Sequence, residues 1–138
     1  MKIIGINRVE LLVADPEKEA TALNALLGIR LESSVTEAHG VLSCIDFTAG
    51  LELAGPTSNE SALAPLLDQR GEGLLTIVFR VDSVDAVIEM AERNGLEVLV
   101  DLEHGDSFAG YKSYRQVSLS SERFPARTSF TFAEYEEA

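Results

Sequence analysis

An internal repeat constrains the fold of this 138-residue chain more than any other feature. Residues 9–31 read VELLVADPEKEATALNALLGIRL, and residues 77–99 read IVFRVDSVDAVIEMAERNGLEVL. In both segments an apolar stretch leads to a polar capping residue, an amphipathic stretch, a glycine and a second apolar stretch. A segment that occurs twice in this order predicts two copies of one strand–helix–strand unit.

Capping residues indicate where the two helices begin and end. Asp15 is a typical N-cap, Pro16 suits the first helical position, and Gly28 can take the left-handed conformation that ends a helix. The second copy has matching signals, namely Asp82 or Ser83 at the start and Gly95 at the end. Apolar residues at three- and four-residue spacing predict one buried stripe per helix. The stripes are Ala20, Leu23, Leu26 and Leu27, and Val84, Val87, Ile88 and Ala91.

Strand-like segments follow each helix. They cover residues 41–47 and 51–54 in the first half, and 96–102, 114–119 and 129–133 in the second. We therefore expect a single α+β domain made of two βαβββ modules, about residues 1–55 and 73–134, joined by a linker at 56–72. Its middle, residues 61–68, can form a short helix.

Composition excludes several classes of function. The formal net charge of −12 weighs against nucleic-acid and anionic-membrane partners, because both need a basic surface. No apolar run approaches the roughly 18 residues that a membrane span requires, and we expect a cytoplasmic protein. The single Cys44 excludes an internal disulfide, and its strand-like surroundings predict a buried, unreactive side chain.

Three segments, in their order and spacing, resemble the vicinal oxygen chelate superfamily, which includes glyoxalase I, bleomycin-resistance proteins, extradiol dioxygenases and methylmalonyl-CoA epimerase. They are RVELLVADPEKEATALNALLGIRL, LELAGP and TIVFRVDSVDAVIEMAERNGLEVL. The resemblance implies two βαβββ modules whose curled mixed sheet surrounds a shared cavity, and also a homodimer. One departure is the segment SSERFPARTSF, where the family usually has an Asp-Pro-Gly turn.

Strand alternation assigns side chains to the two faces of each first strand. One face should meet the helices, through Val9, Leu11 and Val13 and through Ile77, Phe79 and Val81. The opposite face should meet the cavity, through Arg8, Glu10 and Leu12 and through Thr76, Val78 and Arg80.

Metal-using relatives bind a divalent ion with His or Glu side chains from four strands, and the resemblance places Arg8, Glu52, Thr76 and Thr131 at these positions. A guanidinium has no lone pair to offer and stays protonated. A threonine hydroxyl is a poor ligand for a first-row transition metal. His39 and His104 lie outside the ligand strands. We therefore expect no metal and no cofactor.

The hypothesis for this site is that Arg8 pairs with Glu52, that Glu10 shares the guanidinium, and that the cation replaces the metal charge or receives an anionic ligand. A purely structural salt bridge is the alternative. Tyr111 and Tyr114 lie near the segment that often borders the cavity in this family. The predicted ligand-binding residues are Arg8, Glu10, Glu52, Thr76, Arg80, Tyr111, Tyr114 and Thr131.

These residues leave the function open between classes. The first interpretation is a metal-independent protein that binds a small organic molecule, including an anionic one, without turnover. The alternative is an enzyme of the same superfamily, an isomerase, epimerase, lyase or dioxygenase that uses a divalent metal or a carboxylate base such as Glu10 or Glu52. A third is a structural protein whose cavity is filled by side chains. No residue is assigned a catalytic role.

Overall fold

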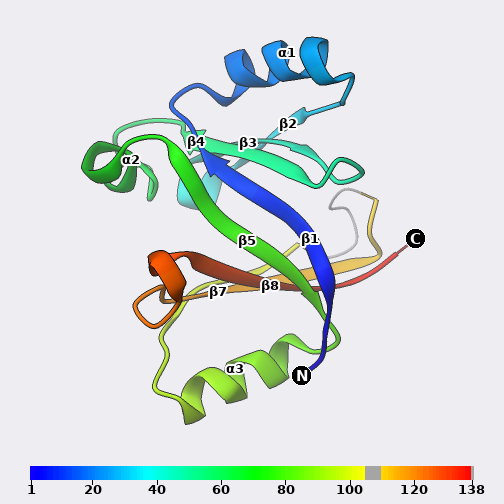
Figure 1. Cartoon of the computed structure of the whole chain (residues 1–138), viewed down its shortest axis with the longest axis vertical. Coiled ribbons are helices and arrows are strands. Elements are labelled where there is room, and N and C mark those ends of the chain that lie inside the picture. The colour runs from blue at the N-terminus through cyan, green and yellow to red at the C-terminus, as the bar shows by residue number, and fades with distance from the viewer. Residues whose placement is uncertain (105–109, 138) are drawn as a thin grey trace. The chain divides into compact units, whose positions relative to one another are not determined.

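The computed structural model describes residues 1–104 and 110–137, and the chain forms two compact units (Figure 1). The first unit comprises residues 8–75, and the second comprises residues 1–7 together with residues from 76 onward. None of the helices in the described ranges is long and apolar enough to cross a membrane.

The first unit is built around a four-stranded sheet with the strand order β2-β3-β4-β1. Strand β1 runs parallel to β4, and the other neighbours are antiparallel. The elements are β1 (Ile3–Leu12), α1 (Pro16–Leu27), β2 (Glu32–Thr36), β3 (Val41–Asp46), β4 (Leu51–Pro56) and α2 (Ala64–Arg70), with a short 3₁₀ helix at Glu37–His39.

The second unit repeats this topology. Its strand order is β5-β8-β7-β6, with β5 parallel to β8 and the other neighbours antiparallel. The α+β class and the two βαβββ modules predicted from the repeat are confirmed. The elements are β5 (Gly73–Val81), α3 (Val84–Arg93), β6 (Val98–Glu103), β7 (Ser113–Leu119) and β8 (Ser129–Glu136), with a 3₁₀ helix at Pro125–Arg127.

The helix boundaries follow the predicted caps. The Asp15 side chain accepts a hydrogen bond from the Lys18 backbone N–H at 3.2 Å, and Gly28 ends α1 with φ of 66°. At the start of α3, Ser83 rather than Asp82 is the N-cap, and its hydroxyl accepts from the Ala86 N–H at 3.1 Å. These signals were readable in the sequence because each acts within one helical turn.

The buried stripe of α3 is confirmed, whereas the stripe of α1 is partly wrong. Val84, Val87 and Ala91 are buried as expected. On α1 the core ends at Leu23, and Leu26 and Leu27 are 77% and 62% exposed. Periodicity identifies an apolar stripe, but it does not tell where the sheet that covers the stripe ends.

Strand register divides each unit into a helix-facing and an opposite face. In the first unit Leu11, Leu53 and Cys44 are aligned across three strands and pack in the core with Ala20. In the second unit Phe79, Phe132 and Val117 are aligned in the same way beneath α3. The predicted alternation is therefore confirmed for both first strands, and Cys44 is buried as expected.

Candidate functional site

Two glutamates lie side by side on the first unit's sheet face that points away from α1. Glu10 of β1 and Glu52 of β4 are directly paired residues of the parallel strands. Paired residues of neighbouring strands project to the same face of a sheet. The two residues are only 7% and 5% exposed, so their carboxyl groups are largely removed from water.

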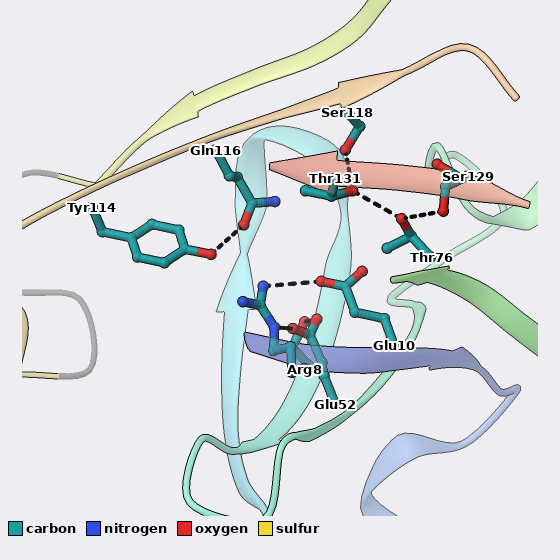
Figure 2. A network of polar contacts seen from close by, with 10 residues as sticks. Arg8, Glu10, Glu52, Thr76, Tyr114, Gln116, Ser118, Ser129 and Thr131 are labelled. Atoms are coloured by element: carbon teal, nitrogen blue, oxygen red, sulfur yellow. Dashed lines mark hydrogen bonds and ion pairs between the residues drawn. The ribbon is translucent and has the colours of Figure 1, made fainter. Parts of the chain in front are cut away.

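One guanidinium contacts both carboxyl groups (Figure 2). Arg8 lies two residues before Glu10 on the same face. Its Nε donates to Glu52 Oε1 at 2.7 Å, and its Nη2 donates to Glu10 Oε1 at 3.0 Å. Its Cζ also lies 5.3 Å from the centre of the Phe47 ring. The predicted pairing of Arg8 with Glu52, and the sharing of the guanidinium by Glu10, are confirmed.

Sequence reasoning missed Ser43, the fourth member of this group. Its hydroxyl donates to Glu52 Oε2 at 2.9 Å, so both carboxylate oxygens of Glu52 accept hydrogen bonds. Ser43 lies on β3 and is paired with Ala54, two residues beyond Glu52, so it projects to the same face as Glu52. Only the register between β3 and β4 reveals this position. We call Arg8, Glu10, Glu52 and Ser43 the carboxylate pair site.

Burial has a strong effect on Glu10. The pKa of Glu10 is raised from 4.5 to about 8, first by removal of the carboxyl group from water and then by the adjacent charge of Glu52, while the Arg8 cation lowers it. A carboxyl group in this position retains its proton at neutral pH. The carboxylate pair site therefore holds a proton that can be exchanged near pH 8.

The second unit carries hydroxyl groups at the positions that correspond to Arg8 and Glu52. Strands β5 and β8 pair as β1 and β4 do, and Val78 and Thr131 occupy the paired positions that Glu10 and Glu52 occupy in the first unit. Thr76 lies two residues before Val78, as Arg8 lies before Glu10. Thr76 Oγ1 donates to the Ser129 carbonyl at 2.9 Å and lies 2.9 Å from Thr131 Oγ1.

An aromatic group in the same unit includes Tyr135, whose ring lies against Arg80. The Arg80 Cζ lies 4.2 Å from the centre of the Tyr135 ring, and Tyr111 lies against the same ring at a centroid distance of 4.4 Å. Tyr114 is fully buried, and its hydroxyl donates to Gln116 Oε1 at 2.7 Å. The structure thus brings three predicted residues together around Tyr135, which sequence reasoning missed. Whether any of the eight predicted residues binds a ligand stays a prediction.

The residues at the four expected metal positions do not fit a divalent ion. Arg8 is a permanent cation, both oxygens of Glu52 accept hydrogen bonds, and Thr76 and Thr131 offer only hydroxyl groups that bond to one another. Within residues 1–104 and 110–137, no three or more His, Cys, Asp or Glu side chains are grouped to hold a metal ion. His104 instead lies against Tyr114, at a centroid distance of 5.7 Å.

Comparison with known families decides the membership of this chain. The family model described as glyoxalase/bleomycin resistance protein/dioxygenase superfamily matches residues 7–113. The chain belongs to this superfamily. The resemblance inferred from the repeat is therefore confirmed. A search of curated proteins gave no match.

Solved structures of this superfamily share the fold. Methylmalonyl-CoA epimerase from Mycobacterium tuberculosis is similar with a TM-score of 0.77 and 19% identity, over 99% of this chain and 89% of the other. A variant of the Streptomyces coelicolor epimerase in complex with 2-nitronate-propionyl-CoA is similar with a TM-score of 0.76 and 23% identity, over 99% and 100%. At these sequence identities the similarity establishes the fold alone. The chemistry of this chain has to be inferred from the residues of its own site.

Proposed function

We propose that this superfamily member is a metal-independent enzyme that moves a proton on a small organic carbonyl compound, as an isomerase or epimerase does. Glu10 is the residue that takes and returns the proton. The observation that supports this proposal best is the pairing of two buried carboxyl groups on one guanidinium, because such a group has one proton to exchange.

Charge balance explains why the proton is held. With both glutamates ionised, the buried group would carry two negative charges and one positive charge. A proton on Glu10 makes the group neutral, and burial favours the neutral form. One Glu52 oxygen accepts a hydrogen bond from Arg8 and the other accepts one from Ser43. Because both Glu52 oxygens are acceptors, we place the shared proton on Glu10. A carboxyl group with a pKa of about 8 exchanges its proton close to working pH, as a general base must.

In the proposed reaction the Glu10 carboxylate removes a proton from the carbon next to a carbonyl group. The electron pair of the broken C–H bond is delocalised onto the carbonyl oxygen as an enolate, and Glu10 then returns the proton to carbon. Arg8 keeps both carboxyl groups in place, and its charge stabilises Glu10 each time the proton leaves. One proton carrier suffices for an isomerase, whereas an epimerase needs a second donor on the opposite side of the substrate.

The comparisons favour the enzyme over the binding protein that the sequence put first. Several of the similar structures are named methylmalonyl-CoA epimerase, among them complexes with methylmalonyl-CoA and with 2-nitronate-propionyl-CoA. Acyl thioesters have an acidic C–H next to a carbonyl group, which is the bond that the Glu10 chemistry requires. We therefore propose small acyl thioesters, anionic ones included, as the first substrates to test.

The test is hydrogen exchange in D₂O. The chelator-treated protein is incubated with methylmalonyl-CoA or propionyl-CoA, and mass spectrometry follows deuterium uptake at the carbon next to the thioester. We expect uptake with the wild type, a loss of at least about 100-fold in Glu10→Gln, and no change in Glu19→Gln on the exposed surface of α1. Absence of uptake with both thioesters, or equal uptake by Glu10→Gln, would contradict the proposal.

A binding protein without turnover is the second candidate. The group formed by Arg80, Tyr111 and Tyr135 favours it, because aromatic rings beside a partly exposed guanidinium can stack on a planar organic ligand. Saturable binding of a thioester by calorimetry, without deuterium uptake, would favour this candidate.

Two expectations from the sequence are kept as proposals. We propose a homodimer, since Ile3, Ile4 and Ile6 are exposed apolar residues on one strand and association would cover them. A monomer in light scattering at micromolar concentration would contradict it. We also propose a cytoplasmic location, which cell fractionation tests.

A further inference from the structure

Four groups of the second unit form a continuous row of hydrogen bonds (Figure 2). Ser118 Oγ lies 2.8 Å from Thr131 Oγ1, Thr131 Oγ1 lies 2.9 Å from Thr76 Oγ1, and Thr76 Oγ1 lies 2.9 Å from the Ser129 carbonyl oxygen. The row runs from β7 through β8 to β5 on the sheet face opposite α3. We call Ser118, Thr131 and Thr76 the hydroxyl row.

The position of each hydrogen in the hydroxyl row follows from the last partner. A carbonyl oxygen only accepts, so Thr76 must donate to Ser129. Its single hydrogen is then used, and the contact with Thr131 needs the Thr131 hydrogen. For the same reason the contact with Ser118 needs the Ser118 hydrogen. Each of the three contacts therefore contains one hydroxyl hydrogen, and every hydroxyl group donates in the direction of the Ser129 carbonyl.

Burial keeps this arrangement in place. Thr131 and Thr76 are only 1% and 4% exposed, so water does not offer their hydroxyl groups an alternative partner. If Ser118 turned its hydrogen outward, its oxygen would face the buried Thr131 oxygen without a hydrogen between them. Ser118 itself is half-buried and lies at the accessible end of the hydroxyl row.

We propose that Ser118 is a ligand-binding residue that acts only as a hydrogen-bond acceptor, and that it selects small organic molecules which present an O–H or N–H group. A hydroxyl oxygen has two lone pairs, and no contact of Ser118 in the described structure uses either of them. Donation by Ser118 into the hydroxyl row also increases the acceptor strength of its oxygen. A carboxylate or a carbonyl oxygen has no hydrogen to offer and is rejected at this position.

This assignment adds a second recognition group to the molecule and does not depend on proton transfer by Glu10. The two modules then differ in a consistent way. At corresponding positions the first module has the ionisable carboxylate pair site, and the second has the hydroxyl row, whose members do not titrate near neutral pH. Recognition at Ser118 should therefore be insensitive to pH where Glu10 is sensitive.

The test uses two probes that differ by one donor, N-methylacetamide and N,N-dimethylacetamide. Amide chemical shifts of Ser118 and its strand neighbours are followed in NMR titrations of the full chain. We expect N-methylacetamide to bind about fivefold tighter, the value of one neutral hydrogen bond. The preference should disappear in Ser118→Ala.

A second variant tests the direction of the hydroxyl row. Thr131→Val keeps the shape of the side chain but removes the group to which Ser118 donates. The released Ser118 hydroxyl can then donate to the carbonyl oxygen of either probe, and the preference for N-methylacetamide should fall to about none. Thr48→Val, the same change at an exposed site of the other unit, should leave the fivefold preference intact.

Three outcomes would overturn the proposal. They are equal affinity of the wild type for the two probes, a preference that persists in Ser118→Ala, and no saturable shift at Ser118 with either probe. A preference that is unchanged in Thr131→Val would overturn the inferred hydrogen direction, and with it the acceptor-only role.

Discussion

Glu10 and Glu52 are direct partners of the parallel strands β1 and β4, and the Arg8 guanidinium contacts both of their carboxyl groups. Like charges on paired residues destabilise a sheet, and here the cation compensates only one of them. The repulsion is relieved by a proton on Glu10. The stability of the fold should therefore depend on pH through this pair.

The first prediction concerns that pH dependence. The pKa of Glu10 is about 8 in the folded chain against an ordinary value of 4.5, so the folded state binds this proton more tightly than the unfolded state. The stabilisation is complete below about pH 4.5 and is lost as the pH rises towards 8. Glu10→Gln has no proton to lose, and its stability should fall less between these values.

Urea denaturation of the wild type and Glu10→Gln at pH 5, 6, 7 and 8 measures this difference, with other titrating groups cancelling between the two proteins. The unfolding free energy of the wild type should fall more steeply with rising pH than that of Glu10→Gln. Two parallel curves would show that Glu10 has the same proton affinity in both states.

The second prediction concerns the removal of the cation. Arg8→Ala leaves two buried carboxyl groups without a positive partner, and loss of one side of a buried ion pair typically costs about 3–5 kcal/mol. Arg30→Ala is the matched control, because Arg30 forms an exposed ion pair with Glu32 at 3.4 Å, which is typically worth less than about 1 kcal/mol. Chemical denaturation measures the free energy of unfolding of both variants. Equal losses of stability in Arg8→Ala and Arg30→Ala would contradict the buried-pair interpretation.

The limits of the sequence prediction are visible in the same site. Strand alternation predicted that Arg8 and Glu10 share a face, and the resemblance to the superfamily placed Arg8 and Glu52 at expected metal-ligand positions. Ser43 was not predicted, because its contact with Glu52 depends on the register between β3 and β4. Tyr135 was missed for a similar reason, since its ring meets Arg80 only once β8 lies beside β5.

The third prediction concerns the pH dependence of the proposed reaction. A general base works in its deprotonated form, so the rate of deuterium uptake should rise with pH and level off above about 8, where Glu10 has lost its proton. The Ser43→Ala variant removes one of the hydrogen bonds to Glu52 and should shift this profile. A rate that falls as the pH rises from 6 to 8 would exclude Glu10 as the base.

The fourth prediction concerns α1, where the buried stripe ends earlier than expected. Leu26 and Leu27 are exposed, so Leu26→Glu and Leu27→Glu should change the stability of the isolated chain by no more than about 0.5 kcal/mol. Val87→Ala is the contrasting variant, since Val87 of α3 is fully buried and its truncation should cost about 1–3 kcal/mol. If either leucine variant is as unstable as Val87→Ala, a second copy of the chain covers the end of α1 in solution, and light scattering of that variant should then show the loss of a dimer.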